Sequence, residues 1–211
     1  MAQNNAYTSA YQRLLSMPEV FNAISFARLN NFTPKEASVY LSRMKSKKMI
    51  DSFDGRAKIY FNLVKNQQAK SECFVDGLKM VYPDAVLRGE SVLHNAGWTT
   101  QIPQRLNIAV LERRSYITIK EATLAPKKQA WYNTVRPYLL RPTNRDNIAT
   151  FGFPALPPAL ALADLYSKSG IKDWHPDPDD LDIEDSDWKD VKKAFDILEL
   201  AVPERYREFV N

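Results

Sequence analysis

Residues 1–65 show a helical pattern of apolar positions that gives way to a strand pattern. Near the N-terminus an apolar residue recurs every three or four positions, which predicts a helix with one buried stripe that ends at Pro18: Tyr7, Ala10, Tyr11, Leu14 and Leu15. A second helix is predicted over residues 19–29, with Phe21, Ile24 and Phe26 available for burial. Asn30 and Asn31 follow it, and asparagine tolerates the left-handed backbone of a tight turn.

A third helix has the clearest start. In Thr33-Pro34-Lys35-Glu36 a threonine N-cap precedes a proline at the first helical position and a glutamate at the third, which is the pattern of a capping box. The predicted buried stripe comprises Ala37, Tyr40, Leu41 and Met44. Two stretches, residues 49–53 and 56–63, flank the hairpin-turn dipeptide Asp54-Gly55, and in the second Ile59, Phe61 and Leu63 alternate with Lys58, Tyr60 and Asn62. Three helices and a hairpin in this order are typical of a winged helix-turn-helix, so we expect residues 1–65 to form one.

The third helix also carries the candidate DNA contacts. In a winged helix this helix enters the major groove and the hairpin, called the wing, touches the DNA backbone. The residues predicted to point away from its apolar stripe are Lys35, Ser38, Ser42, Arg43 and Ser46. Of these, Ser38, Ser42 and Arg43 are the candidates for reading base edges. Candidates for phosphate contacts are Lys45, Lys47 and Lys48 at the helix end, and Arg56 and Lys58 on the wing.

Residues 66–211 mix helical and strand patterns. Helices are predicted over residues 67–82 and 159–168, strands over 106–110 and 116–120, and a proline-interrupted acidic loop over 177–187. A closing helix is predicted from Trp188 to Val202. We therefore expect an α+β chain, in which an N-terminal winged helix-turn-helix is followed by a mixed α/β domain, residues 66–211, that has a C-terminal helix and an acidic C-terminal segment.

Charge is distributed unevenly along a chain whose net charge is +4. Residues 1–65 contain ten Lys or Arg and four Asp or Glu, residues 66–170 contain thirteen and eight, and residues 171–211 contain six and thirteen. A basic N-terminal segment favours a phosphate-bearing partner, whereas an acidic segment repels one. The sequence thus predicts that its two ends meet different partners.

Composition is that of a folded protein. Hydrophobic residues make up 45% and charged residues 26% of the 211 residues. No apolar run is long enough to cross a bilayer, the N-terminus lacks the pattern of a signal peptide, and Cys73 is the single cysteine. We therefore expect a cytoplasmic protein without a membrane partner.

The segment Arg88–Pro103, followed by the strand predicted over 106–110, resembles the abortive-infection type IV antitoxin family (AbiEi-like). In that family a Gly-x-Ser-Ala-Leu-His-like turn and helix leads through a Thr-Thr-Gln-x-Pro-like segment into a strand; here these are Gly89–His94 and Thr99–Pro103. Residues 159–165 are similar to a later signature of the family, and with the winged helix the resemblance covers most of the chain up to about residue 170. Val92, Trp98 and Ala159-Leu160 depart from the family pattern.

The resemblance implies a repressor that binds double-stranded operator DNA and controls its own toxin-antitoxin operon. It also implies that a C-terminal part counteracts a nucleotidyltransferase-like toxin without requiring a stable complex. The family gives no motif for the acidic residues 173–190.

The sequence offers few candidates for catalysis or metal binding. His94 and His175 lie far apart without cysteines at ligand spacing, and the aspartates of residues 177–187 lack the central glycine and final glutamate of a calcium loop. Gly89-Glu90-Ser91 lacks the second glycine of a nucleophile elbow and is interpreted as a helix cap. Asp164, a lone carboxylate in an apolar helix, is expected to be a hydrogen-bonded structural residue.

These observations favour a DNA-binding protein that is not an enzyme and uses neither a cofactor nor a metal. Trp131 and Tyr132, beside Lys127 and Lys128, are expected to be core residues rather than a stacking platform for nucleic acid. Two alternatives stay open. One is a nuclease that acts through its second domain, and the other is a winged-helix adaptor that binds only protein.

Overall fold

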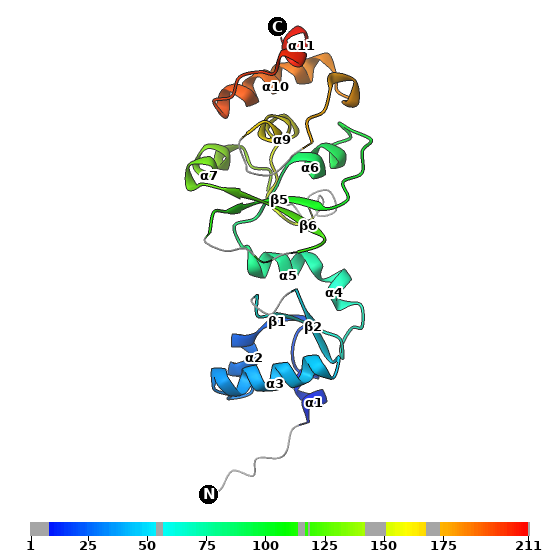
Figure 1. Cartoon of the computed structure of the whole chain (residues 1–211), viewed down its shortest axis with the longest axis vertical. Helices are drawn as coiled ribbons and strands as arrows, with labels where there is room; N and C mark the ends of the chain where they lie inside the picture. The colour runs from blue at the N-terminus through cyan, green and yellow to red at the C-terminus, as the bar shows by residue number, and fades with distance from the viewer. Residues whose placement is uncertain are drawn as a thin grey trace, which may run out of the picture. The chain divides into compact units, whose positions relative to one another are not determined.

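The computed structural model describes residues 9–53, 57–113, 117, 119–141, 151–167 and 174–210. The chain divides into two compact units, Met1–Pro83 and Asp84–Asn211 (Figure 1). Each unit combines helices with a three-stranded sheet, so the fold is α+β as the sequence predicts. No helix within the described ranges has the length and apolar character needed to cross a membrane.

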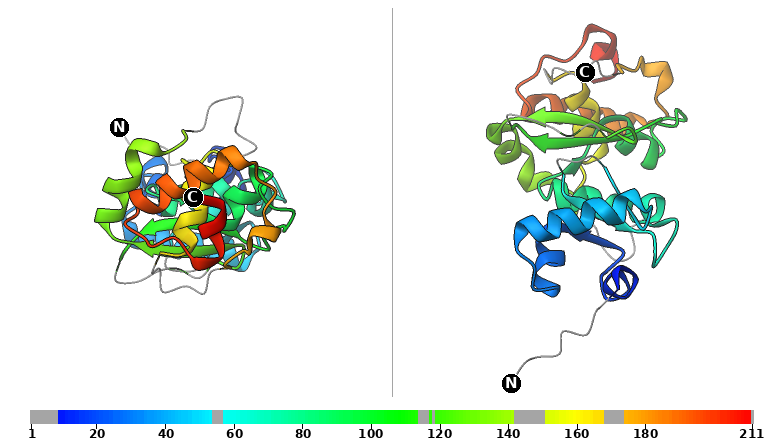
Figure 2. Two further views of the ribbon diagram at one scale, coloured as in Figure 1. Left: turned by 90° about the horizontal axis from the view of Figure 1, so that it is seen from above. Right: turned by 60° about the horizontal axis from the view of Figure 1, so that its bottom comes forward.

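The first unit contains a winged helix. Its elements, in chain order, are α1 (Ala10–Leu15), β1 (Val20–Asn22), α2 (Ala23–Leu29), α3 (Pro34–Ser46), β2 (Ile50–Ser52), β3 (Ile59–Asn62), α4 (Ala69–Glu72) and α5 (Phe74–Val81). The sheet is antiparallel in the order β1-β3-β2, with Phe21 opposite Tyr60 and Asp51 opposite Phe61. Strands β2 and β3 form the predicted hairpin, whose tip at residues 54–56 lies outside the described residues. Figure 2 shows α2 and α3 side by side, as in a helix-turn-helix.

The core of this unit forms where the helical stripes meet the sheet. Of the predicted stripe on α3, Ala37, Leu41 and Met44 are buried, and they join Leu14 and Phe26 in one hydrophobic cluster. Asn62 was predicted on the polar side of its strand, but it is fully buried. Its side-chain amide donates a hydrogen bond of 2.7 Å to the carbonyl of Leu14, so this buried polar group is satisfied and fixes α1 to the sheet.

The helix predicted over residues 19–29 is wrong in its first part. Val20–Asn22 form strand β1, because they pair with β3, and α2 begins only at Ala23. Asn22 marks that boundary, since its side chain accepts a hydrogen bond of 2.8 Å from the amide of Ser25.

The first unit extends beyond the boundary expected after residue 65 and ends at Pro83. The helix predicted over residues 67–82 is divided at Cys73 into α4 and α5. Helix α5 packs on β3 at Gly77, where an added Cβ atom would lie 2.7 Å from the ring of Phe61. This close contact explains why α5 belongs to the winged-helix unit.

The second unit is a mixed sheet covered by layers of helices. Its elements are β4 (Val86–Leu87), α6 (Gly89–Asn95), β5 (Leu106–Leu111), β6 (Ala122–Lys127), α7 (Gln129–Val135), η1 (Arg136–Tyr138), α9 (Pro158–Leu165), η2 (Pro178–Asp180), α10 (Asp185–Ile197), η3 (Glu204–Tyr206) and α11 (Arg207–Val210). Strand β5 runs antiparallel to β4 and parallel to β6. Figure 1 shows α6 and α9 over one face of this sheet, with α10 and α11 outside α9.

Two sequence predictions for this unit are corrected. Of the strand predicted over residues 116–120, residues 116 and 118 lie outside the described residues, and Ile117, Ile119 and Lys120 are not in a strand; the strand that follows β5 in the described chain is β6. The acidic loop ends early because α10 already begins at Asp185, where Glu184 and Asp187 form a capping box. Carboxylates in the first turn of a helix are favoured by its dipole, so part of the acidic run serves as a helix start.

Candidate nucleic-acid interface

Helix α3 has a capped start, and one face and its last turn attach it to the rest of the unit. At the start, the amide of Glu36 donates 3.3 Å to Thr33 Oγ1 and the amide of Thr33 donates 2.8 Å to Glu36 Oε2, which confirms the predicted capping box. At the other end, Lys45 Nζ donates to Ser52 Oγ of β2 at 2.5 Å. Because the buried stripe and the bond from Lys45 to β2 fix the helix, its opposite face has a defined orientation.

That opposite face carries the predicted contact residues. Lys35, Ser38, Ser42 and Arg43 are all exposed, as is Val39, which is 44% exposed between them. Ser46 Oγ donates to the carbonyl of Ser42 at 3.1 Å, so Ser46 is directed back along the helix. The structure thus brings the ammonium group of Lys35, the guanidinium group of Arg43 and the hydroxyl groups of two serines onto a single helical surface.

The predicted phosphate contacts differ in their surroundings. Lys47 and Lys48 are exposed at the end of α3, and Lys58 is exposed at the base of the wing. The ammonium group of Lys45 is instead directed toward β2 by its bond to Ser52. Arg56 lies outside the described residues. Lys47, Lys48 and Lys58 are therefore the clearest backbone-contact candidates.

Two lysines of the first unit bond to other residues of the same unit. Lys70 pairs with Asp51 at 2.9 Å, and Lys65 Nζ donates to the carbonyl of Met17 at 3.0 Å. Residues 66–83 add two lysines and two acidic residues, so the whole unit retains the +6 charge of residues 1–65. An excess of this size attracts polyanions regardless of sequence.

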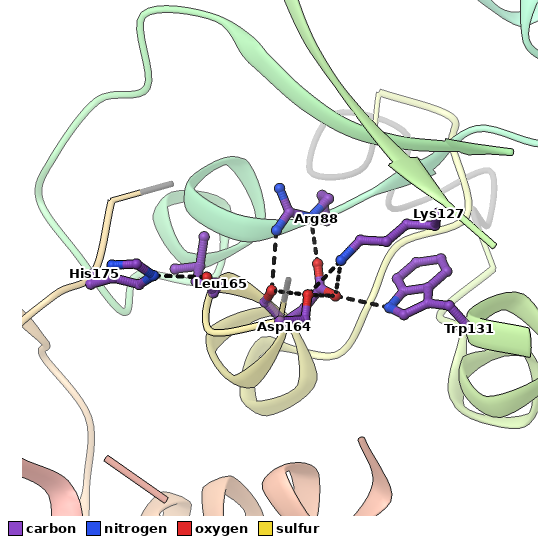
Figure 3. A network of polar contacts seen from close by, with 7 residues as sticks. Arg88, Lys127, Trp131, Asp164, Leu165 and His175 are labelled. Carbon is purple, nitrogen blue, oxygen red and sulfur yellow. Dashed lines mark hydrogen bonds and ion pairs between the residues drawn. The ribbon is translucent and has the colours of Figure 1, made fainter. Parts of the chain in front are cut away.

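The second unit contains a buried ionic cluster that the sequence did not predict as a set (Figure 3). Asp164, on α9, is fully buried and forms ion pairs with Arg88, which is also fully buried, and with Lys127, which is 4% exposed. Asp164 Oδ1 accepts from Lys127 Nζ at 2.7 Å, from Trp131 Nε1 at 2.8 Å and from Ser167 Oγ at 3.0 Å. The cluster therefore fixes α9 to the end of β4, the end of β6 and helix α7.

The electrostatics of Asp164 follow from these neighbours. Burial by itself raises the pKa of this carboxyl, but the charges of Arg88 and then Lys127 outweigh it, so the pKa lies below its ordinary value. The carboxylate is therefore charged and enclosed. This agrees with the structural, hydrogen-bonded role expected for Asp164, and its chemistry suits cross-linking of elements rather than proton transfer with solvent.

Other residues singled out in the sequence have structural contacts. Ser91 does not cap α6, which has Arg88 at its N-cap without a side-chain bond; Ser91 Oγ instead accepts 2.9 Å from the amide of Asn107 in β5. His175 Nε2 lies 2.9 Å from the carbonyl of Leu165. His94 is half-buried on α6, and its Nδ1 has no hydrogen-bond partner among the described atoms. No group of three or more His, Cys, Asp or Glu side chains is gathered for a metal within the described ranges.

No protein-family profile matches the chain, and no curated protein matches it. Among solved structures, the chain is similar to the RV2827C protein from Mycobacterium tuberculosis, with a TM-score of 0.46 and 14% sequence identity. The alignment covers 95% of this chain and 78% of that chain. A likeness of this degree assigns neither a family nor a function to this chain.

Proposed function

We propose that the protein is a cytoplasmic transcriptional repressor that binds double-stranded operator DNA through α3 and the wing, and that it is the antitoxin of a type IV toxin-antitoxin system. One observation carries the DNA-binding part. A helix with a buried apolar stripe exposes Lys35, Ser38, Ser42 and Arg43 on its opposite face, in a winged-helix unit with a charge of +6.

The arrangement supports a division between affinity and specificity. Lys47 and Lys48 are exposed at the end of α3 and Lys58 at the base of the wing, and they would attract phosphates of any sequence. Arg43 has the forked donors that recognise guanine in the major groove, and Ser38 and Ser42 can bond to several base edges. Binding of DNA in general would thus depend on the lysines, and choice of sequence on the centre of α3.

The antitoxin part rests on the family resemblance, and the contacts of the second unit support it indirectly. Two segments that carry the resemblance, residues 88–110 and 159–165, lie far apart in the sequence, yet Arg88 of the first pairs with Asp164 of the second. These segments therefore share one folded unit, which could act separately from the winged helix. By the same resemblance, the target is a nucleotidyltransferase-like toxin.

Two experiments test the two parts. For DNA binding, the full chain is incubated with a pool of random duplexes and with the DNA upstream of its own gene; enrichment of one shared sequence is expected. Failure to retain any duplex would favour the protein-binding adaptor. Release of shortened fragments during incubation would favour the nuclease.

For antitoxin activity, residues 84–211 are co-expressed with a nucleotidyltransferase-like toxin from the neighbouring gene. We expect this fragment to lose operator binding and to retain at least part of the growth rescue. The fragment begins at the boundary between the compact units, so we expect it to fold by itself. Circular dichroism measures whether it does. A folded fragment without any rescue would contradict separate roles.

A further inference from the structure

A groove of about 680 Å³ opens in the first unit between α2, the start of α3 and the base of the wing. Ser38 of α3 and Lys58 of the wing line it, and both are candidate DNA contacts. The groove therefore shares residues with the proposed DNA surface. Its volume falls in the range, about 300–1,000 Å³, that is typical of small-molecule sites.

The lining combines apolar walls with positive charge. Ala27, Phe32 and Tyr60 are among the lining residues, and so is Ile24, whose side chain is 64% exposed. Arg28 and Lys58 also line the groove, and none of the described residues that line it is acidic. Neither cation forms an ion pair with another described residue. Charge complementarity therefore favours a ligand with a negative charge and an apolar body.

Two residues of the groove lining have a left-handed backbone. Asn31 and Lys58, both in the lining, have positive φ angles of 53° and 51°. Lysine rarely adopts this left-handed conformation, and here it is held by a hydrogen bond of 3.1 Å from the amide of Ala23 to the carbonyl of Lys58. This bond fixes the backbone of Lys58 beside the start of α2, at one side of the groove.

We propose that this groove binds a small aromatic anion, and that the bound anion displaces DNA. The aromatic body would lie against Phe32 and Tyr60, with its charge near Lys58 and Arg28. Because Ser38 and Lys58 cannot serve the ligand and the DNA at the same time, occupation of the groove weakens operator binding. Binding of the anion is inferred from the groove alone, whereas displacement of DNA by the bound anion rests on the proposed function.

The probe for the first part is anilinonaphthalene sulfonate, an aromatic anion that becomes fluorescent in apolar sites. It is titrated into the full chain and into two variants of α2, Ile24→Glu and Leu29→Glu. The two side chains are matched, at 64% and 63% exposed, but only Ile24 lines the groove. A glutamate at the rim repels the anion, so we expect Ile24→Glu to weaken probe binding about tenfold and Leu29→Glu to change it less than about twofold.

Two further titrations examine the charge requirement. Arg28→Ala leaves the apolar wall in place and is expected to weaken the probe about fivefold. The neutral analogue N-phenylnaphthylamine is expected to bind more weakly than the anion. Equal affinity of all variants for the probe, no saturable binding, or preference for the neutral analogue would overturn the aromatic-anion site. Thermal unfolding of each variant shows whether it remains folded.

The second part is tested by adding the selected operator duplex to the protein–probe complex. We expect the fluorescence to fall as DNA binds, with a midpoint set by the affinity for DNA. If DNA and probe bind together without competition, the regulatory inference is wrong while DNA binding stands. If no duplex binds at all, the proposed function fails together with the competition, and the probe titrations still decide whether the groove is a ligand site.

Discussion

At Asp164, one carboxylate contacts two buried cations. Arg88 and Lys127 are removed from water, and charged groups in that situation are costly unless they are paired. Asp164 supplies the pairing, and Trp131 and Ser167 complete the hydrogen bonds of Oδ1. The stability of the second unit therefore depends strongly on this one charge.

Asp164→Asn should destabilise the second unit by about 3–5 kcal/mol, because it leaves two buried cations without their anion. Asp190→Asn is the control, since Asp190 is exposed in its pair with Lys193 and should cost at most about 1 kcal/mol. Urea unfolding measures both. Equal stability of Asp164→Asn and the wild type would show that the ionic cluster contributes little to the free energy of unfolding.

The same substitution should change the response to acid. The pKa of Asp164 is lowered in the folded state, so its contribution is present above the unfolded pKa of about 4 and is lost as the pH falls through the folded pKa. The difference in unfolding free energy between wild type and Asp164→Asn should thus be largest at neutral pH and shrink at acidic pH. A difference that grows with acid would have the wrong sign.

Cys73 should react slowly. Burial, followed by its hydrogen bond of 3.0 Å to Glu19 Oε2 and the nearby negative charges, raises the pKa of this thiol to about 11. At pH 8 only about one molecule in a thousand then carries the reactive thiolate, so alkylation by iodoacetamide should be about a hundredfold slower than for free cysteine. Glu19→Gln should accelerate the reaction. An unchanged rate would show that Glu19 does not control this thiol.

Arg43 and Lys58 should have different effects on DNA binding. Arg43→Ala is expected to reduce discrimination between operator and scrambled duplexes by about 1–3 kcal/mol, as for loss of a base-edge contact. Lys58→Ala should weaken binding to both duplexes similarly. Fluorescence anisotropy titrations measure the four affinities. Equal losses on both duplexes for Arg43→Ala would assign Arg43 to the DNA backbone.

At the level of elements, prediction succeeded where the sequence carries a local signal. Helix α3 has its cap, its proline and its stripe within one stretch, and its bounds follow from them. Strand β6 contains Ala122 and Pro126 and has no clear alternation. Among the described strands it pairs with β5 alone and lies at the edge of the sheet, a position that tolerates proline, and no local pattern reveals that pairing. The sequence does not predict the partners of Asp164 either. Arg88 lies 76 residues away and Lys127 lies 37 residues away, and local patterns do not show pairs so far apart in the chain.

The contact of α5 with β3 gives a prediction at this scale. Replacing glycine by alanine inside a helix normally stabilises it by about 1 kcal/mol. In Gly77→Ala the new Cβ would lie 2.7 Å from Phe61 and 3.0 Å from Phe53, so we expect destabilisation of about 1–3 kcal/mol instead. Asp76→Ala, at the exposed neighbouring position in the first turn of α5, is the control and should change stability by less than about 1 kcal/mol, because the better helix propensity of alanine offsets the lost interaction with the helix dipole. Stabilisation by Gly77→Ala in thermal unfolding would contradict the close packing.

For the whole molecule, the net charge of +4 conceals two opposite units. Unit Met1–Pro83 carries +6, so Asp84–Asn211 carries −2. The sequence places the negative charge in residues 171–211 and the domain boundary after residue 65, since no local pattern shows that α5 packs on β3. The cation excess of the chain therefore lies in the unit that contains the winged helix, which supports assigning DNA binding to that unit.

The salt dependence of DNA binding tests the central proposal most directly. Anisotropy titrations of the full chain with its operator duplex are repeated over a series of salt concentrations. If α3 and the wing make about five phosphate contacts, log K falls against log salt with a slope of about −4.5. The variant Lys58→Ala should reduce the slope by about 0.9. Binding that is indifferent to salt, or a slope that Lys58→Ala leaves unchanged, would contradict a DNA interface formed by α3 and the wing.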